Sequence, residues 1–170
     1  MNQTVTSACT SINRNRMPAI YGKLMIRFVD RVLDYGCGRY TEHLYNHCKE
    51  RNAKFFPIDP FNQPDWKNRL SHDMLEKYPA TIGIMSNVLN VIDSDDAIRQ
   101  AVEDALSLVS SKYFLYITVY EGDKSGIGKY TGKDSYQRNM RLKDYVPMLR
   151  KMGFDAFVDH GTIMIQGKHA

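Results

Sequence analysis

The feature that most constrains this chain is a short apolar strand that ends in two glycines. The stretch reads Val32-Leu33-Asp34-Tyr35-Gly36-Cys37-Gly38, and a helical pattern from about Thr41 to Arg51 follows it. Glycines placed directly after a strand let the backbone turn sharply and let a ligand approach the main chain. The next helix then points its unpaired N–H groups into the same crevice. This unit predicts an α/β fold with a ligand site at the carboxyl end of the strand.

Apolar segments alternate with helical patterns along the rest of the chain, which predicts a mostly parallel sheet with helices on both faces. We expect strands at 31–35, 54–58, 81–85, 113–119, 154–158 and 162–166, and helices from Pro18 through Phe28, from Thr41 to Arg51, from Asp93 or Ser94 to Val109, and from Leu142 to Met152. The last two strands flank the tight turn Asp159-His160-Gly161 and form a C-terminal antiparallel hairpin. The polar stretch 61–79 predicts a loop with about one helical turn near Met74. We expect Trp66 to pack there, with stacking on adenine as the alternative. The sheet is therefore reduced to about six strands.

The 170 residues contain no repeat and no linker, so we expect a single domain over residues 1–170. Residues 1–16 are polar and predict an N-terminal arm, whereas residues 120–141 predict a long loop on the substrate side of the sheet. The sequence has no signal peptide and no apolar run of the roughly 20 residues that span a membrane. Cys9, Cys37 and Cys48 have neither a disulfide framework nor metal-ligand spacing, which predicts a reducing, cytoplasmic setting without a metal site.

A carboxylate before the glycines favours one class of ligand. Asp34 would repel a pyrophosphate and attract a cationic amino-acid group. S-adenosylmethionine presents an ammonium, a sulfonium and a carboxylate, so it fits this loop better than a dinucleotide does. The nicotinamide alternative also lacks the third glycine of its fingerprint, where Thr41 stands.

The stretch Asp34-Tyr35-Gly36-Cys37-Gly38 resembles motif I of class I S-adenosylmethionine-dependent methyltransferases. The resemblance implies a Rossmann-like sheet, S-adenosylmethionine as cofactor, and a carboxylate after the second strand, Asp59, that binds the ribose hydroxyls. It also places residues 85–92 at the methyl-transfer crevice. The cofactor-binding residues it implies are Asp34, Tyr35, Gly36, Cys37, Gly38, Asp59, Pro60, Asn87 and Val88, and the catalytic candidates are Asn87 and Tyr120. The same motifs are similar to those of methyltransferases linked to DNA phosphorothioation and of short phage-borne relatives.

The chain departs from the family pattern in the motif I loop and in the acceptor motifs. Tyr40 stands where motif I usually has a small residue, and only Asp65 and Asp73 are candidates for the carboxylate that reads adenine. A Pro-Cys nucleophile and the Asn/Asp-Pro-Pro-aromatic motif of amino-group DNA methyltransferases are both missing. The sequence therefore predicts no cytosine C5 chemistry and does not identify the methyl acceptor.

Basic residues and tyrosines interleave in segment 120–141. Its cations are Lys124, Lys129, Lys133, Arg138 and Arg141, with Tyr130 and Tyr136 between them. This pattern predicts a lid or a nucleic-acid surface, unless the segment is simply a solvated loop. A net charge of +4 is compatible with an anionic partner and does not require one. The leading hypothesis is methyl transfer to a small molecule or nucleic acid. The alternatives are a non-catalytic module that binds S-adenosylmethionine, nucleic acid or protein, and an enzyme that cleaves the cofactor.

Overall fold

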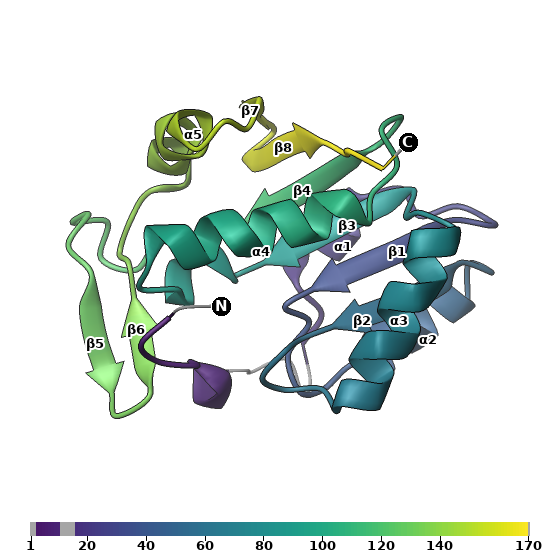
Figure 1. The fold of residues 1–170 in the computed structure, drawn as a ribbon, viewed down its shortest axis with the longest axis horizontal. Helices are drawn as coiled ribbons and strands as arrows, with labels where there is room; N and C mark the ends of the chain where they lie inside the picture. Colours follow the sequence, from purple (N-terminus) through teal and green to yellow (C-terminus); the bar gives the residue numbers. More distant parts are fainter. Residues whose placement is uncertain (1–2, 11–15, 170) are drawn as a thin grey trace.

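A computed structural model describes residues 3–10 and 16–169, which form a six-stranded sheet with helices on both faces and a separate two-stranded hairpin (Figure 1). The helices are η1 (Ala8–Thr10), α1 (Ala19–Lys23), α2 (Glu42–Lys49), α3 (Asp65–Lys77), η2 (Leu89–Val91), α4 (Asp95–Ser107) and α5 (Leu142–Lys151). The strands are β1 (Arg31–Tyr35), β2 (Lys54–Ile58), β3 (Ile82–Ser86), β4 (Phe114–Thr118), β5 (Lys129–Gly132), β6 (Ser135–Gln137), β7 (Ala156–Asp159) and β8 (Thr162–Gln166). Within the described ranges, no helix is long and apolar enough to cross a membrane.

The large sheet confirms the predicted fold class. Its strand order is β2-β1-β3-β4-β8-β7, in which β1 to β4 run parallel while β8 and β7 form the antiparallel C-terminal hairpin. The four parallel strands all end at the same edge of the sheet. Ligand sites in open α/β sheets lie outside that edge, so the fold brings the loops after β1, β2, β3 and β4 together there.

Alternating side chains of the strands build one core on each face of the sheet. On one face Val32 packs with Ile20 of α1 and Leu44 of α2. On the other face Leu33 packs in a larger core with residues of α3, α4 and α5. Successive strand side chains point to opposite faces, so Asp34 lies on the α1 face together with Val32.

Strand β2 is an edge of the sheet, which explains how it accommodates a proline. Lys54 N donates to Asp30 O at 2.8 Å, so Lys54 and then Phe56 turn their N–H groups toward β1. Pro57 consequently faces the free edge, where no N–H donor is needed. An edge without that donor is also a poorer template for pairing with another chain.

The prediction of a loop over residues 61–79 is wrong, because Asp65–Lys77 form the 13-residue helix α3. Pro64 precedes its first turn, where a proline is tolerated. Within the helix only Ser71 and Leu75 are buried, so the sequence shows no broad apolar face that would reveal a helix. Trp66 is 63% exposed and does not pack into the core, contrary to expectation.

Two further predictions of local structure are corrected. Segment 120–141 is not one loop, since β5 and β6 form an antiparallel hairpin within it. All four residues of β5 are exposed, so the apolar alternation that predicts a strand is missing. The first helix is shorter than its apolar spacing predicts: it ends at Lys23, and Met25 and Phe28 are exposed beyond it.

We expect the two leucines of α3 to differ sharply in their contribution to stability. Leu75 is fully buried, so Leu75→Ala should lower the free energy of unfolding by about 2–5 kcal/mol. Leu70 is 56% exposed, and Leu70→Ala should change it by no more than about 0.5 kcal/mol. Urea unfolding followed by circular dichroism measures both values. Equal effects of the two substitutions would contradict the packing of α3 described above.

Candidate functional site

The loop after β1 owes its shape to two glycines in the left-handed region. Gly36 and Gly38 both have φ +77°, a conformation that favours glycine. A Cβ atom on Gly36 would lie 2.3 Å from Cγ2 of Val88, so the loops after β1 and β3 approach each other too closely for any other residue. Gly36 N also donates to Ile58 O at 2.7 Å, which ties the loop to the end of β2.

The carboxylate of Asp59 joins the loop after β2 to the glycine loop. Its Oδ2 accepts a hydrogen bond from Gly38 N at 2.9 Å. Its Oδ1 accepts from Phe61 N at 3.0 Å and from Asn62 N at 2.9 Å. The Asn62 side-chain amide adds longer contacts of 3.3 and 3.4 Å to the two oxygens. Asp59 is buried, yet it remains in the wall of the pocket that opens between these loops.

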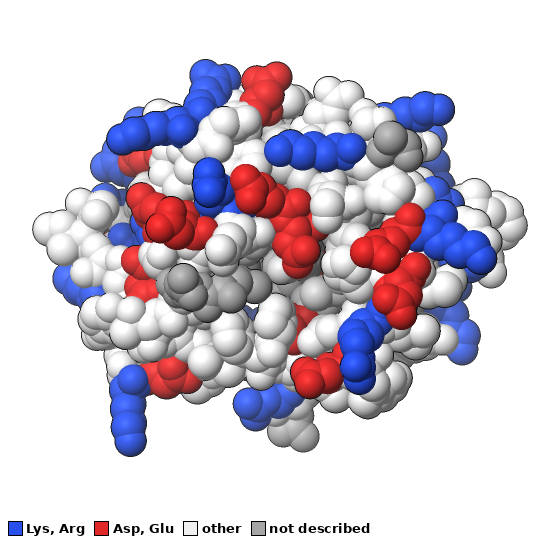
Figure 2. All heavy atoms as spheres, viewed as in Figure 1, with Lys and Arg blue, Asp and Glu red and all other residues white. Residues whose placement is uncertain are grey.

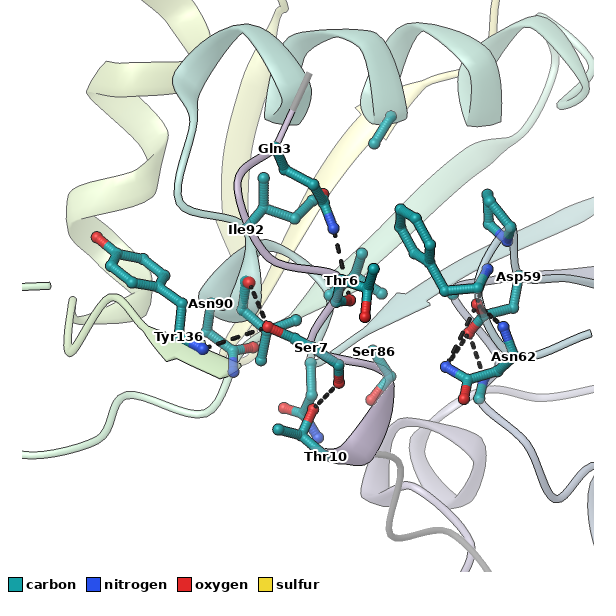
Figure 3. Close-up of a pocket in the computed structure, with 18 of the residues that line it drawn as sticks. Gln3, Thr6, Ser7, Thr10, Asp59, Asn62, Ser86, Asn90, Ile92 and Tyr136 are labelled. Carbon is teal, nitrogen blue, oxygen red and sulfur yellow. Dashed lines mark hydrogen bonds between the residues drawn. The ribbon is translucent and has the colours of Figure 1, made fainter. Parts of the chain in front are cut away.

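A pocket of about 470 Å³ lies at the carboxyl edge of the sheet. Figure 3 shows Asp59 and Asn62 on one side of it and Asn90 and Tyr136 on the other. Of the residues predicted from the sequence, the structure brings together in its lining Tyr35, Gly36, Gly38, Asp59, Pro60, Asn87, Val88 and Tyr120. Most of the predicted site thus converges on one cavity.

Asp34 and Cys37 do not line this pocket, so the geometry does not offer them the direct ligand contact that the resemblance implies. Asp34 lies on the α1 face of the sheet, where Tyr21 Oη donates to its Oδ2 at 2.7 Å. Burial raises the pKa of Asp34 to about 7; the hydrogen bond from Tyr21 acts in the opposite direction, and the negative charge of Asp59 adds to the rise. Cys37 is buried as well, and burial raises the pKa of its thiol. Both side chains are buried behind the pocket lining and contribute to the packing of the loop.

The raised pKa of Asp34 predicts a pH-dependent stability. In the unfolded chain the group titrates near pH 4, whereas the folded protein holds its proton up to about pH 7. Between about pH 4 and pH 7 the folded state therefore binds more protons than the unfolded state. The free energy of unfolding that protonated Asp34 contributes is consequently lost as the pH rises from about 4 to about 7. Asp34→Asn keeps an oxygen acceptor for Tyr21 and never ionises, so it should remove this loss, which is on the order of 4 kcal/mol. Urea unfolding at pH 4.5 and 7.5 checks this, and parallel pH profiles of the two proteins would contradict it.

The predicted N-terminal arm forms a roof over the pocket, although residues 1–2 and 11–15 of it lie outside the described residues. Thr4 N donates to both oxygens of Asp93 at 3.1 and 3.2 Å. Thr6 donates to Asp134 through its N–H at 2.7 Å and also through its hydroxyl. Ser7 Oγ donates to Val91 O at 3.0 Å. The arm thereby connects the segment before α4 to the β5–β6 hairpin, and it adds Gln3, Thr6, Ser7 and Thr10 to the lining, four residues that the sequence did not single out.

A cycle of amide hydrogen bonds fixes the far wall of the pocket. Asn90 Nδ2 donates to Gln137 Oε1 at 3.2 Å, and Gln137 Nε2 donates to Tyr120 O at 3.0 Å. Tyr120 N closes the cycle with a 3.4 Å bond to Asn90 Oδ1. Sequence reasoning did not assign Gln137, because the contact joins segments that only the fold brings together. The cycle holds the backbone of Tyr120, whose side chain remains exposed at the rim.

Asn87, the other catalytic candidate, lies at the turn that follows β3. Its φ is +57°, a value that asparagine adopts more readily than most residues, and its N–H donates to Thr118 O at 2.8 Å. Asn87 is exposed and belongs to the lining of the pocket. Asn87 and Tyr120 therefore stand where the loops after β3 and β4 meet the cavity.

Three of the five basic residues of segment 120–141 are paired with carboxylates. Lys124 pairs with Glu121 at 3.4 Å, Lys129 with Asp123 at 3.0 Å, and Arg138 with Asp95 at 2.8 Å. Figure 2 shows acidic and basic residues interspersed over the viewed face of the molecule. The lid, the nucleic-acid surface and the solvated loop all stay predictions for this segment.

Comparison of the sequence with protein-family models and with curated proteins finds no match. Solved structures do share the fold. A 1,6-didemethyltoxoflavin-N1-methyltransferase of Burkholderia thailandensis, with bound 1,6-didemethyltoxoflavin and S-adenosylhomocysteine, is 15% identical over 99% of this chain and 80% of its own, with a TM-score of 0.55. A S-adenosylmethionine-dependent methyltransferase from Methanosarcina mazei is 13% identical over 91% of this chain and 99% of its own, with a TM-score of 0.57. The chain has the Rossmann-like fold of these methyltransferases.

Proposed function

We propose that this chain binds S-adenosylmethionine in the pocket at the carboxyl edge of the sheet and transfers its methyl group to an acceptor. One observation carries the proposal: the glycine loop after β1 and the buried carboxylate of Asp59 meet in the wall of a single cavity. The Burkholderia thailandensis neighbour, which shares the fold, was solved with S-adenosylhomocysteine bound, and this supports the same ligand class here.

The residues of the pocket fit an adenosyl group. A carboxylate has about four acceptor positions, and backbone N–H groups occupy three of those on Asp59. The Asn62 amide contacts at 3.3 and 3.4 Å are long, so ribose hydroxyls can replace them. Asn62 Oδ1 is buried without a hydrogen-bond donor among the described residues, and a ribose hydroxyl can donate to it once that side chain turns. Gly36 and Gly38 border the cavity without side chains, so the main chain of the glycine loop faces the rest of the ligand.

When bound, S-adenosylmethionine supplies a methyl group that its sulfonium activates for displacement. The protein then has to hold the acceptor in line with this group and exclude water. The N-terminal arm and the β5–β6 hairpin cover the cavity and serve the second purpose. Asn87 and Tyr120 lie at the turns that face the acceptor, and we assign them to its orientation. A strong base is not required when the acceptor atom already carries a lone pair.

The cofactor assignment predicts a defined thermal response. S-adenosylmethionine or S-adenosylhomocysteine at about 100 times its dissociation constant should stabilise the chain by roughly 2.7 kcal/mol, a shift of several degrees, whereas NAD should not. Asp59→Asn turns an amide toward backbone donors and should weaken binding at least about tenfold. Asp155→Asn, exposed between α5 and β7 and outside the described pocket lining, is the matched control. Calorimetric titration of the three proteins measures the affinities. Equal affinity of Asp59→Asn and the control would overturn the ribose assignment.

Formation of a methylated product distinguishes this proposal from a non-catalytic binding module. With labelled S-adenosylmethionine and an extract of small metabolites, Tyr120→Phe should reduce product formation at least about tenfold while cofactor affinity stays within about twofold. Tyr113→Phe, which lies outside the described pocket lining, is the control. Cofactor binding without any labelled product would favour the binding module. The narrower similarity to methyltransferases linked to DNA phosphorothioation and to phage-borne relatives stays a prediction from the motifs.

A further inference from the structure

The pocket extends well away from Asp59, the proposed ribose ligand. We call its far side the acceptor half; it is lined by Ser7, Asn90, Val91, Ile92, Tyr120, Thr131, Tyr136 and Gln137. Figure 3 shows Asn90 and Tyr136 across the cavity from Asp59, with Gln3, Thr6 and Ser7 of the arm between the two sides. The chemistry of the acceptor half determines which molecules can enter it beside the cofactor.

The lining of the acceptor half carries no formal charge among the described residues. Asp59, at the opposite end, is the one side chain with a full charge in the described lining. Asn90 and Gln137 already use their amide groups in the hydrogen-bond cycle with Tyr120. Val91 and Ile92 supply apolar surface, whereas the ring of Tyr136 points away from the cavity (Figure 3) and packs against Tyr130. A charged group that entered this half would therefore lose its hydration without gaining a partner of opposite charge.

The charges around the rim are unfavourable to an anion. Asp93 and Asp134 hold the arm at the edge of the cavity. Arg138 pairs with Asp95 at 2.8 Å and donates to Ile92 O at 2.8 Å, so its charge is already matched by a carboxylate. Carboxylates at the rim repel phosphate and carboxylate groups. A cationic acceptor would instead meet the sulfonium of the proposed cofactor.

The roof also disfavours a polymer. Hydrogen bonds from Thr4, Thr6 and Ser7 fasten the arm to both walls of the acceptor half, and Tyr136 N donates to Ser7 Oγ at 3.3 Å from the hairpin side. A nucleic-acid strand could enter only if these bonds were released, and no described cation of the lining would compensate for them. A small molecule needs only a local opening.

We propose that the acceptor is an uncharged small molecule that packs against Val91 and Ile92 under the N-terminal arm. The inference rests on the proposed function for the place of the cofactor. The absence of charge on the acceptor is inferred from the uncharged described lining, the pairing of Arg138 with Asp95, and the carboxylates of Asp93 and Asp134.

Titration calorimetry with ring compounds of matched shape and different charge tests this inference. The probes are 2-naphthol as the neutral form, 6-hydroxy-2-naphthoate as the anion, 2-naphthylmethylammonium as the cation, and a short oligothymidylate, each with and without saturating S-adenosylhomocysteine. We expect 2-naphthol to bind at least about tenfold more tightly than any charged probe, because the charged probes lose hydration without compensation. Thr131→Lys places a cation in the acceptor half and should shift the preference at least about tenfold toward the naphthoate. Thr131→Gln is the uncharged control of similar length.

Each result has a distinct meaning. Tighter or equal binding of a charged probe or of the oligothymidylate by the unmodified protein overturns the inference. An absence of 2-naphthol binding, or a Thr131→Lys protein that behaves like Thr131→Gln, overturns it as well. If S-adenosylhomocysteine itself does not bind while the preference for 2-naphthol persists, the proposed function fails and the charge selectivity of the pocket stands.

Discussion

The site depends on one interaction, the hydrogen bond from Gly38 N to the carboxylate of Asp59 at 2.9 Å. It connects the ends of two neighbouring parallel strands, so the glycine loop cannot move independently of the loop after β2. The same carboxylate caps the N–H groups of Phe61 and Asn62, and a buried carboxylate with three backbone donors is held in one orientation. Because Asp59 also borders the cavity, the group that shapes the site is the group proposed to bind the ribose.

The second support of the site is the roof. The arm at one end of the chain and the hairpin between β4 and α5 have little core of their own, since β5 is exposed along its length. Polar contacts to Asp93, Asp134 and Val91 hold them in place. Such contacts are individually weak and exchange readily with water. A roof held in this way can exclude solvent and still open for the proposed acceptor. Opening a roof held by apolar packing would require more free energy, because buried apolar surface would be exposed to water.

Asp34 shows how a sequence motif and its structural role can differ. Its place before the glycines favours contact with a cationic ligand, but strand alternation turns its side chain to the face that α1 covers. There it accepts a hydrogen bond from Tyr21, and burial raises its pKa to about 7. Its effect on a ligand is therefore transmitted through the position of the loop. The side chain of Tyr35, the next residue, points to the other face and borders the cavity.

The sequence by itself determined the fold class, the six-stranded sheet with its closing hairpin, and the convergence of Gly36, Gly38, Asp59, Asn87 and Tyr120 at one edge. Strand periodicity, glycine turns and the common direction of parallel strands are local rules that can be read from neighbouring residues. These rules did not predict helix α3 or the β5–β6 hairpin. Few residues of α3 and none of β5 are buried, so neither element has a clear apolar periodicity. Only the tertiary structure decided which residues face the cavity, how the arm closes it and which cations are paired. Those properties arise from contacts such as Thr6–Asp134 and Asn90–Gln137, whose partners are far apart in sequence and carry no local signal of each other.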